Sequence, residues 1–303
     1  MNLKNRCDII KFLDRHYNDV YRHSMTDKRF FVSDLDGTLL RSDGTLSAYS
    51  RNNLERLLAD GLQFTVASAR SVQAIQPVLG DLPLQMPIIE FNGAIISDLA
   101  TGHHEIINEI ESSITSEILA MVQNNGFSPF ISTSNDTKDL LYYCNISNEG
   151  MELYLKNRID NKDNRLYKVK RLNESLSDRV ICFTIINRKN KLIDLKSEVV
   201  ERYGIHLANQ FMENPYSPGW YWLTLFDSHA TKDQAILKLM DRYGFSADNL
   251  TVFGDNANDI RMFKLASKAI AVENAKDELK KHATDIIGMN EDDSVVRYLI
   301  ANK

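Results

Sequence analysis

Two widely separated stretches of the sequence each hold a pair of closely spaced aspartates. Asp34 and Asp36 are two residues apart, Asp255 and Asp259 are four residues apart, and each pair follows a short apolar run. Four carboxylates on neighbouring loops would repel one another unless a cation lay among them. Hard oxygen ligands in this number suit Mg²⁺. The sequence therefore predicts a magnesium site among these side chains.

The same residue types suit the hydrolysis of a phosphate ester, which resists nucleophiles because its own negative charge repels them. Asp34 can attack phosphorus and form an aspartyl-phosphate, which divides the hydrolysis into two easier displacements. Asp36 can protonate the leaving oxygen and then deprotonate the attacking water. Lys232 opens an expected helix and offers a compact positive charge to the phosphoryl oxygens.

Further polar residues accompany the first aspartate pair and the ends of other apolar runs. Thr38 can hydrogen-bond around the first loop, and we place it with the phosphate-binding residues. Ser68 can donate its hydroxyl to a phosphoryl oxygen, cap the following helix, or do both. Arg70 can reach an anionic group of a substrate or pair with a surface carboxylate. Asn92 can contact substrate or turn the chain between domains, and the sequence leaves these choices open.

The elements that must position these side chains alternate between strand and helix. The apolar runs expected to form strands lie at 29–33, 62–67, 86–91, 250–253 and 269–272. The helices expected between them span 47–60, 71–79 and 232–243. This βαβ alternation is typical of a parallel sheet, in which ligands bind at the carboxyl ends of the strands. The predicted fold class is α/β, with a doubly wound parallel-sheet core built from two separated segments.

The middle of the chain has a different pattern, in which helical and β-rich stretches are mixed. Helices are expected at 114–123 and 192–203, and β-rich runs at 140–143, 180–186 and 220–226. The charged stretch 156–170 has few apolar residues and is expected to form an exposed loop. We therefore predict a core domain of residues 29–99 and 227–303, interrupted by an inserted α+β cap domain of residues 100–226.

Residues 1–28 precede this pattern and carry apolar residues spaced along one face of a helix. We expect an N-terminal amphipathic helical extension. It can pack on its own chain, the reading that we favour, or it can dock a partner and mediate a homodimer.

The composition excludes some classes of function. The 303 residues carry a formal net charge of -5, with 43% hydrophobic and 25% charged residues, which are ordinary values for a globular protein. The chain lacks the excess of Lys and Arg that nucleic-acid binding would need, and no apolar run approaches the length of a membrane helix. The three cysteines, Cys7, Cys144 and Cys182, are too few and too widely spaced for a disulfide framework. We expect a cytoplasmic protein whose partner is a small phosphate ester.

Five segments of the chain resemble the motifs of the haloacid dehalogenase superfamily in its Cof-type phosphatase branch. The most specific are residues 34–40, Asp-Leu-Asp-Gly-Thr-Leu-Leu, and residues 254–262, which contain Gly-Asp-Asn-Ala-Asn-Asp. Weaker matches lie at 66–70, 91–94 and 230–235, in the order that the family shows. The resemblance covers residues 29 to the end, apart from the details of the cap. It implies a phosphatase core with a cap that closes over the site.

The resemblance also implies a role for each matching residue. Asp34 would be the nucleophile and Asp36 the acid and base. Phosphate contacts would come from Ser68, Lys232 and Asn258. Metal ligands would be Asp34, Asp255 and the backbone carbonyl of Asp36, with Asp259 binding through water or holding Lys232. Family members commonly have Thr-Gly-Arg where this chain has Ser68-Ala69-Arg70, so the hydroxyl is retained. Ala69 adds a methyl group where the family has glycine, so the substrate preference of the family carries over to this chain less directly.

These observations favour a Mg²⁺-dependent phosphatase acting on small phosphomonoesters, with sugar phosphates implied by the resemblance. A phosphotransferase or mutase would use the same aspartyl-phosphate and return it to a second hydroxyl. A non-catalytic signalling or partner-binding protein is disfavoured, because a receiver needs a long-lived phosphoryl group and Asp36 would hydrolyse it. The adjacent His103 and His104 do not predict a second metal site, because neighbouring side chains on a strand point apart.

Overall fold

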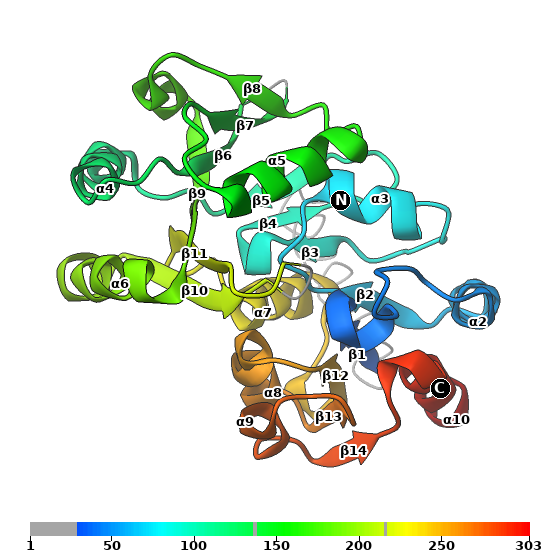
Figure 1. The fold of residues 1–303 in the computed structure, drawn as a ribbon. Coiled ribbons are helices and arrows are strands. Elements are labelled where there is room, and N and C mark those ends of the chain that lie inside the picture. The colour runs from blue at the N-terminus through cyan, green and yellow to red at the C-terminus, as the bar shows by residue number, and fades with distance from the viewer. Residues whose placement is uncertain (1–28, 136–137, 215–216) are drawn as a thin grey trace, which may run out of the picture.

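The computed structural model describes residues 29–135, 138–214 and 217–303. In Figure 1 the chain forms a lower sheet with its helices and an upper sheet with its own helices, joined by a small third sheet. The expected amphipathic helix within residues 1–28, and the homodimer that it was expected to mediate, lie outside the described residues. Within the described part of the chain, no helix has the length and apolar character needed to cross a bilayer.

The lower sheet is parallel and has the order β14-β13-β12-β1-β2. Its strands are β1 (Phe30–Ser33), β2 (Gln63–Val66), β12 (Leu250–Gly254), β13 (Lys268–Val272) and β14 (Asp285–Ile287). The chain runs from β1 outward to β2 and later returns to the other side of β1 through β12, β13 and β14. This reversal is the doubly wound α/β arrangement that the sequence predicts.

Helices cover this core sheet. They are α2 (Ala48–Ala59), α3 (Val72–Leu79), α7 (Lys232–Tyr243), α8 (Ile260–Leu265), α9 (Asp277–Lys280) and α10 (Ser294–Asn302). Helices α2, α3 and α7 lie where the sequence predicts them, whereas no ranges were predicted for α8, α9 and α10. Helix α2 begins after Ser47, whose side chain accepts a hydrogen bond from the Ser50 amide. Helix α7 ends at Gly244, which has a left-handed φ of 73°.

A small antiparallel sheet connects the core to the rest of the chain. It consists of β3 (Ile88–Glu90), β4 (Ile95–Ser97) and β5 (His104–Ile107). The run 86–91 was expected to extend the parallel sheet. Strand β3 instead pairs along its length with β4, and its pairing beside β2 consists of one isolated parallel bridge between Ala67 and Ile89. Strand β5 lies beyond the expected domain boundary at residue 99 and pairs with β4, which lies before it.

The upper sheet has six strands in the order β10-β11-β9-β6-β7-β8, and we call it the cap sheet. Its strands are β6 (Phe130–Ser134), β7 (Asp139–Tyr143), β8 (Leu166–Lys168), β9 (Arg179–Asn187), β10 (Leu207–Glu213) and β11 (Tyr221–Asp227). Its helices are α4 (Ser112–Asn124), α5 (Glu149–Asp160) and α6 (Lys189–Tyr203). All pairs are antiparallel except the parallel pair β7 and β8.

The stretch 156–170 corrects one expectation, because it is not a single exposed loop. Its first residues form the last turns of α5, which Asn148 caps by accepting a hydrogen bond from the Met151 amide. The stretch also contains β8. The buried side of α5 is supplied earlier by Met151 and Tyr154, so the later turns are free to be charged.

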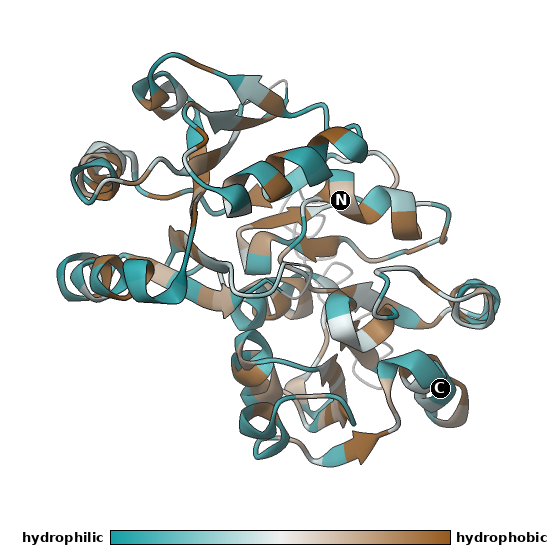
Figure 2. Ribbon diagram, in the orientation of Figure 1, coloured by the Kyte–Doolittle hydropathy of each residue, from teal (hydrophilic) through white to brown (hydrophobic). Residues whose placement is uncertain are grey.

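The two main sheets have separate hydrophobic cores. One cluster of buried residues packs around the parallel sheet, and another packs between the cap sheet and helices α4 and α6. Figure 2 shows the corresponding pattern, with hydrophobic colours on many strand segments and hydrophilic colours on much of α6. The predicted site residues Asp34, Lys232 and Asp255 therefore belong to a core domain whose hydrophobic cluster is distinct from that of the cap.

Candidate active site

Three of the predicted residues meet at the carboxyl ends of β1 and β12. The Lys232 ammonium donates a hydrogen bond to Asp34 over 2.5 Å and another to Asp259 over 2.7 Å. Lys232 is only 2% exposed, Asp34 is 5% exposed and Asp259 is fully buried. The first turn of α7 thus places a buried cation between carboxylates that come from opposite ends of the sequence.

Burial and mutual charge strongly affect these groups. Burial raises the pKa of Asp34 and outweighs the opposing effect of the Lys232 charge, while Asp259 raises it further. Burial also raises the pKa of Asp255, and the charges of Asp34 and Asp259 add to the effect. Burial alone would lower the pKa of Lys232, but Asp259 and Asp34 more than reverse this and raise it. The protein's own cation therefore compensates only part of the negative charge gathered here.

The carboxylates have the geometry to bind a divalent cation. Asp34, Asp255 and Asp259 each offer an oxygen, and these oxygens lie within 4.8 Å of one another. Gly37 has φ +78°, and a Cβ at this position would lie 2.6 Å from a carboxylate oxygen of Asp255, so the loop leaves room for that side chain. The excess of hard oxygen donors fits Mg²⁺. The Asp36 side chain is not a member of this group, which leaves only its backbone carbonyl as the predicted ligand.

Asp36 instead faces Arg70. The Arg70 guanidinium donates from Nε to one Asp36 oxygen over 2.8 Å and from Nη2 to the other over 2.6 Å. Of the two roles left open for Arg70, the structure shows the pairing with a carboxylate. The carboxylate is that of Asp36, the predicted acid and base. Thr38, four residues after Asp34, donates its hydroxyl to Asp34 over 3.2 Å.

Ser68, Asn92 and Asn258 are linked by hydrogen bonds, and Asn258 directly precedes Asp259 of the site. Ser68 is 1% exposed, its hydroxyl accepts a hydrogen bond from the Arg70 amide over 3.1 Å, and its carbonyl accepts one from the Asn92 amide over 2.8 Å. The Asn92 carboxamide accepts from Asn258 over 3.2 Å and donates to Gln210 of β10 over 2.8 Å. These amides form a bridge from the core to the cap.

Gln210 was not predicted from the sequence. Alternating side chains could have indicated a strand at residues 207–213, but only the tertiary structure shows that this strand crosses over Asn92. Asn92 itself has φ +58° and is followed by Gly93 at φ +113°, so it also turns the chain. Both roles considered for Asn92 are therefore compatible with its position.

A second buried polar network, away from the carboxylate group, was also not predicted. Both ring nitrogens of His104 face acidic partners, with Nδ1 3.4 Å from Glu90 and Nε2 2.9 Å from Asp139. Gln73 of α3 donates to Asp139 over 2.9 Å, so the network joins β5, the cap strand β7 and a core helix. The Ser97 hydroxyl lies 2.7 Å from Nδ1 of His104 and also bonds to Glu90. Burial alone would lower the pKa of His104, but its interactions with Asp139 and Glu90 raise it to about 9. His104 is therefore an imidazolium at neutral pH.

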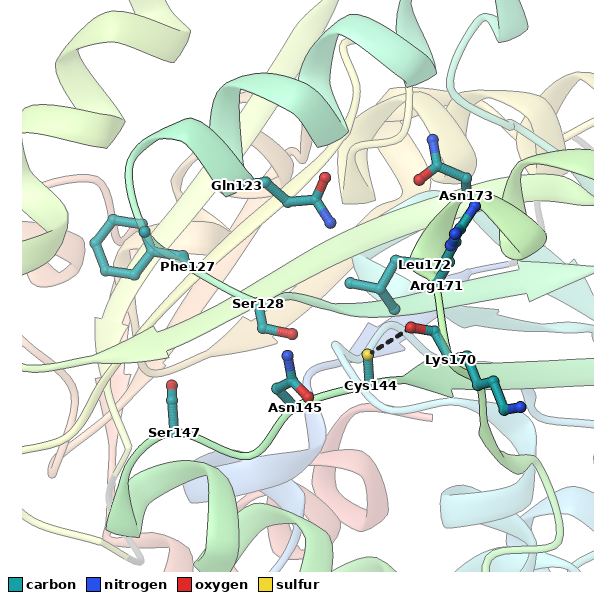
Figure 3. Close-up of a pocket in the computed structure, with 11 residues that line it drawn as sticks. Gln123, Phe127, Ser128, Cys144, Asn145, Ser147, Lys170, Arg171, Leu172 and Asn173 are labelled. Atoms are coloured by element: carbon teal, nitrogen blue, oxygen red, sulfur yellow. Dashed lines mark hydrogen bonds between the residues drawn. The ribbon is translucent and has the colours of Figure 1, made fainter.

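A cavity of about 400 Å³ lies on the cap (Figure 3). It is lined by residues after α4, after β7 and after β8, and the Cys144 thiol beside it donates to the Lys170 carbonyl over 3.3 Å. Its lining contains none of the carboxylates or amides described above, so the cavity is separate from the candidate active site.

The core and its site suit chemistry on phosphoryl groups. A parallel sheet ends in a buried carboxylate and lysine pair, three converging carboxylates could hold a cation there, and a second sheet lies above. Residues 31–299 match the haloacid dehalogenase-like hydrolase family. The chain belongs to this family, and it is an enzyme of the phosphoric monoester hydrolase class.

The chain is similar along most of its length to proteins of known name. It is 27% identical over 286 residues to the 5-amino-6-(5-phospho-D-ribitylamino)uracil phosphatase YwtE of Bacillus subtilis, covering 88% of this chain and 95% of the relative. It is 25% identical over 284 residues to the pyridoxal phosphate phosphatase YbhA of Escherichia coli, covering 90% and 98%. A haloacid dehalogenase-like hydrolase from Bacteroides thetaiotaomicron shares its fold, with a TM-score of 0.75, 23% identity and coverage of 91% and 99%.

Proposed function

We propose that this protein is a Mg²⁺-dependent phosphatase that hydrolyses small phosphomonoesters through an aspartyl-phosphate on Asp34. The observation that carries the proposal is the placement of the Lys232 ammonium between Asp34 and Asp259, with Asp255 beside them. A dianionic phosphoryl group can approach a carboxylate nucleophile only where positive charge compensates both.

Each step can be assigned to a residue of this chain. Asp34 attacks phosphorus through a carboxylate oxygen, the bond to the leaving oxygen breaks, and Asp36 supplies the proton that the leaving group requires. A water then attacks the phosphoryl group, Asp36 removes its proton, and Asp34 is regenerated. Lys232 holds Asp34 in place and neutralises the phosphoryl oxygens throughout.

The contact between Arg70 and Asp36 has a consequence for this mechanism. Because Arg70 binds both Asp36 oxygens, it holds the acid and base in one orientation before substrate arrives. The proton that Asp36 transfers must lie on a lone pair that Arg70 does not occupy, unless one of these bonds opens. The Ser68 hydroxyl and the Asn258 amide complete the proposed phosphate contacts.

Mg²⁺ would be held by Asp34, Asp255 and the Asp36 carbonyl, with Asp259 as a further or water-mediated ligand. When bound, it supplies positive charge to the phosphoryl oxygens and aligns the attacking carboxylate. The three converging carboxylates, whose charge Lys232 compensates only in part, support this assignment.

Phosphate release from p-nitrophenyl phosphate and a panel of sugar phosphates, with and without Mg²⁺, tests the proposal. The wild type is expected to release phosphate only with the metal, and Asp34→Asn is expected to abolish release. Asp60→Asn makes the same chemical change at an exposed core aspartate and should leave activity unchanged. Metal-independent release, or full activity in Asp34→Asn, would disprove the mechanism.

Two finer points belong to the same proposal. Sugar or polyol phosphates are favoured as substrates by the similarity to YwtE, whose named substrate carries a phosphoribityl group. A cytoplasmic location is favoured because Cys144 and Cys182 are free thiols, as expected in a reducing compartment.

A further inference from the structure

The cap face that lies over Asn92 carries a row of neutral polar side chains between two hydrophobic rows. Strand pairing places Gln210 opposite Thr224, and Thr224 opposite Thr184, so these three side chains point to the same face of the sheet. We call them the polar row. The hydrophobic row on one side packs against the segment that leaves the core, and its members are Ala208, Phe226 and Cys182. The row on the other side lies toward α5, and its members are Met212, Trp222 and Ile186.

The polar row is connected directly to the candidate active site. Gln210 accepts a hydrogen bond from Asn92 over 2.8 Å, and Asn92 accepts one from Asn258, the neighbour of Asp259. Among the residues that the structure describes, the Gln210 amide nitrogen and the Thr224 hydroxyl have no hydrogen-bond partner. Hydrogen-bonding capacity is therefore available to a ligand that extends from the phosphate site toward the cap.

Two charged groups on this side of the cap are already paired. Arg165 is 4% exposed and acts electrostatically on Cys182 of the adjacent row, but its guanidinium is held by both oxygens of Asp163, at 2.8 and 2.6 Å. His104 lies between Glu90 and Asp139. A second anionic group on the substrate could use Arg165 or His104 only by displacing the carboxylate that each already binds, which costs free energy.

We propose that the polar row binds the leaving group of the substrate, and that Gln210 selects uncharged, hydroxyl-bearing leaving groups over those that carry a second phosphate or a carboxylate. This inference rests on the proposed phosphatase function. It adds to that function a specificity-determining residue and a charge class for the part of the substrate beyond the phosphoryl group. A hydroxyl of the leaving group donates to or accepts from the Gln210 carboxamide and the Thr224 hydroxyl.

The test compares kcat/KM for three kinds of substrate, with Mg²⁺ present. These are p-nitrophenyl phosphate, which has no hydroxyl on its leaving group; neutral sugar and polyol monophosphates such as ribose 5-phosphate and ribitol 5-phosphate; and fructose 1,6-bisphosphate and 3-phosphoglycerate. The variant is Gln210→Leu, which keeps the size of the side chain and removes its hydrogen bonds. Asn209→Leu is the matched control, because it lies on the same strand and points to the opposite face.

The wild type is expected to prefer at least one monophosphate with an uncharged leaving group over both compounds that carry a second anionic group. Gln210→Leu is expected to lower kcat/KM for that monophosphate about tenfold, the effect of one lost hydrogen bond, and to change the value for p-nitrophenyl phosphate less than about threefold. Asn209→Leu should alter neither ratio.

Two results would overturn the inference and leave the phosphatase intact. One is an equal loss on both substrates in Gln210→Leu, which would indicate a merely structural role. The other is a wild-type preference for the bisphosphate or the phosphocarboxylate. Absence of phosphate release from p-nitrophenyl phosphate by the wild type would instead refute the proposed function itself.

Discussion

Replacement of Gly93 by alanine provides a sharp test of how the chain turns beside Lys232. Gly93 has φ +113°, and a Cβ at this position would overlap the backbone of Thr231, with the Thr231 nitrogen 2.8 Å away and its carbonyl closer still. Backbone atoms cannot move aside as a flexible side chain can. Thr231 directly precedes Lys232, so any displacement is passed to the first residue of α7.

The expected cost has two parts. A side chain in a left-handed conformation costs roughly 1–2 kcal/mol. Overpacking against a fixed neighbour adds roughly 1–3 kcal/mol, so Gly93→Ala should lower the free energy of unfolding by about 2–5 kcal/mol in total. Gly61→Ala is the matched control, because Gly61 has φ +90° in the same domain and its Cβ would meet no atom within 4 Å. Gly61→Ala should lower the free energy of unfolding only by the conformational cost of roughly 1–2 kcal/mol.

Urea unfolding followed by far-UV circular dichroism measures the difference. Both tryptophans of the chain, Trp220 and Trp222, are in or beside cap strand β11, so their fluorescence would report on the cap rather than on the core. Activity provides a second measurement, because a shift of about 1 Å in a positioning residue can lower kcat about 10²-fold. If Gly93→Ala were no less stable than Gly61→Ala and fully active, the close contact with Thr231 would be wrong.

Two further substitutions test the charged groups. Lys232→Met leaves Asp34 and Asp259 buried without their cation and should lower the free energy of unfolding by about 3–5 kcal/mol. The control is Lys264→Met on the exposed face of α8, which should change it by less than about 0.5 kcal/mol in the same urea titration. Because the pKa of His104 is raised, its protonated form stabilises the fold. This stabilisation is fully present below the unfolded pKa of about 6.5 and is lost as pH rises through the folded pKa of about 9. The difference in free energy of unfolding between wild type and His104→Gln should therefore fall by about 2–3 kcal/mol between pH 7 and pH 10. A constant difference over that range would contradict the paired imidazolium.

The core could be predicted from the sequence because its signals are local. The apolar runs that end at Asp34 and at Asp255 are short, buried and bounded by polar residues, and they form β1 and β12 as expected. Gly244 and Ser47 mark helix ends through backbone conformation and capping, which neighbouring residues largely decide.

The parts that could not be predicted depend on contacts between distant segments. The burial of His104 between Glu90 and Asp139 requires three strands to converge, and no spacing in the sequence indicates it. The same holds for Gln210, whose partner Asn92 is 118 residues away. The stretch 156–170 was misassigned for a different reason: the charged outer turns of α5 resemble a loop when the buried residues lie earlier in the helix.

The discontinuous core has a consequence for synthesis of the chain. Phe30 of β1 pairs with Leu250 of β12, so β1 emerges from the ribosome with only β2 available as a neighbour. At roughly 5–20 residues per second, the missing partner arrives tens of seconds later, after the entire cap has been made. Throughout that interval one edge of a wholly buried strand is unpaired, a condition that promotes aggregation. Early folding of the cap, whose strands pair largely with near neighbours, would shorten the chain that must be spanned and bring the two halves of the core together.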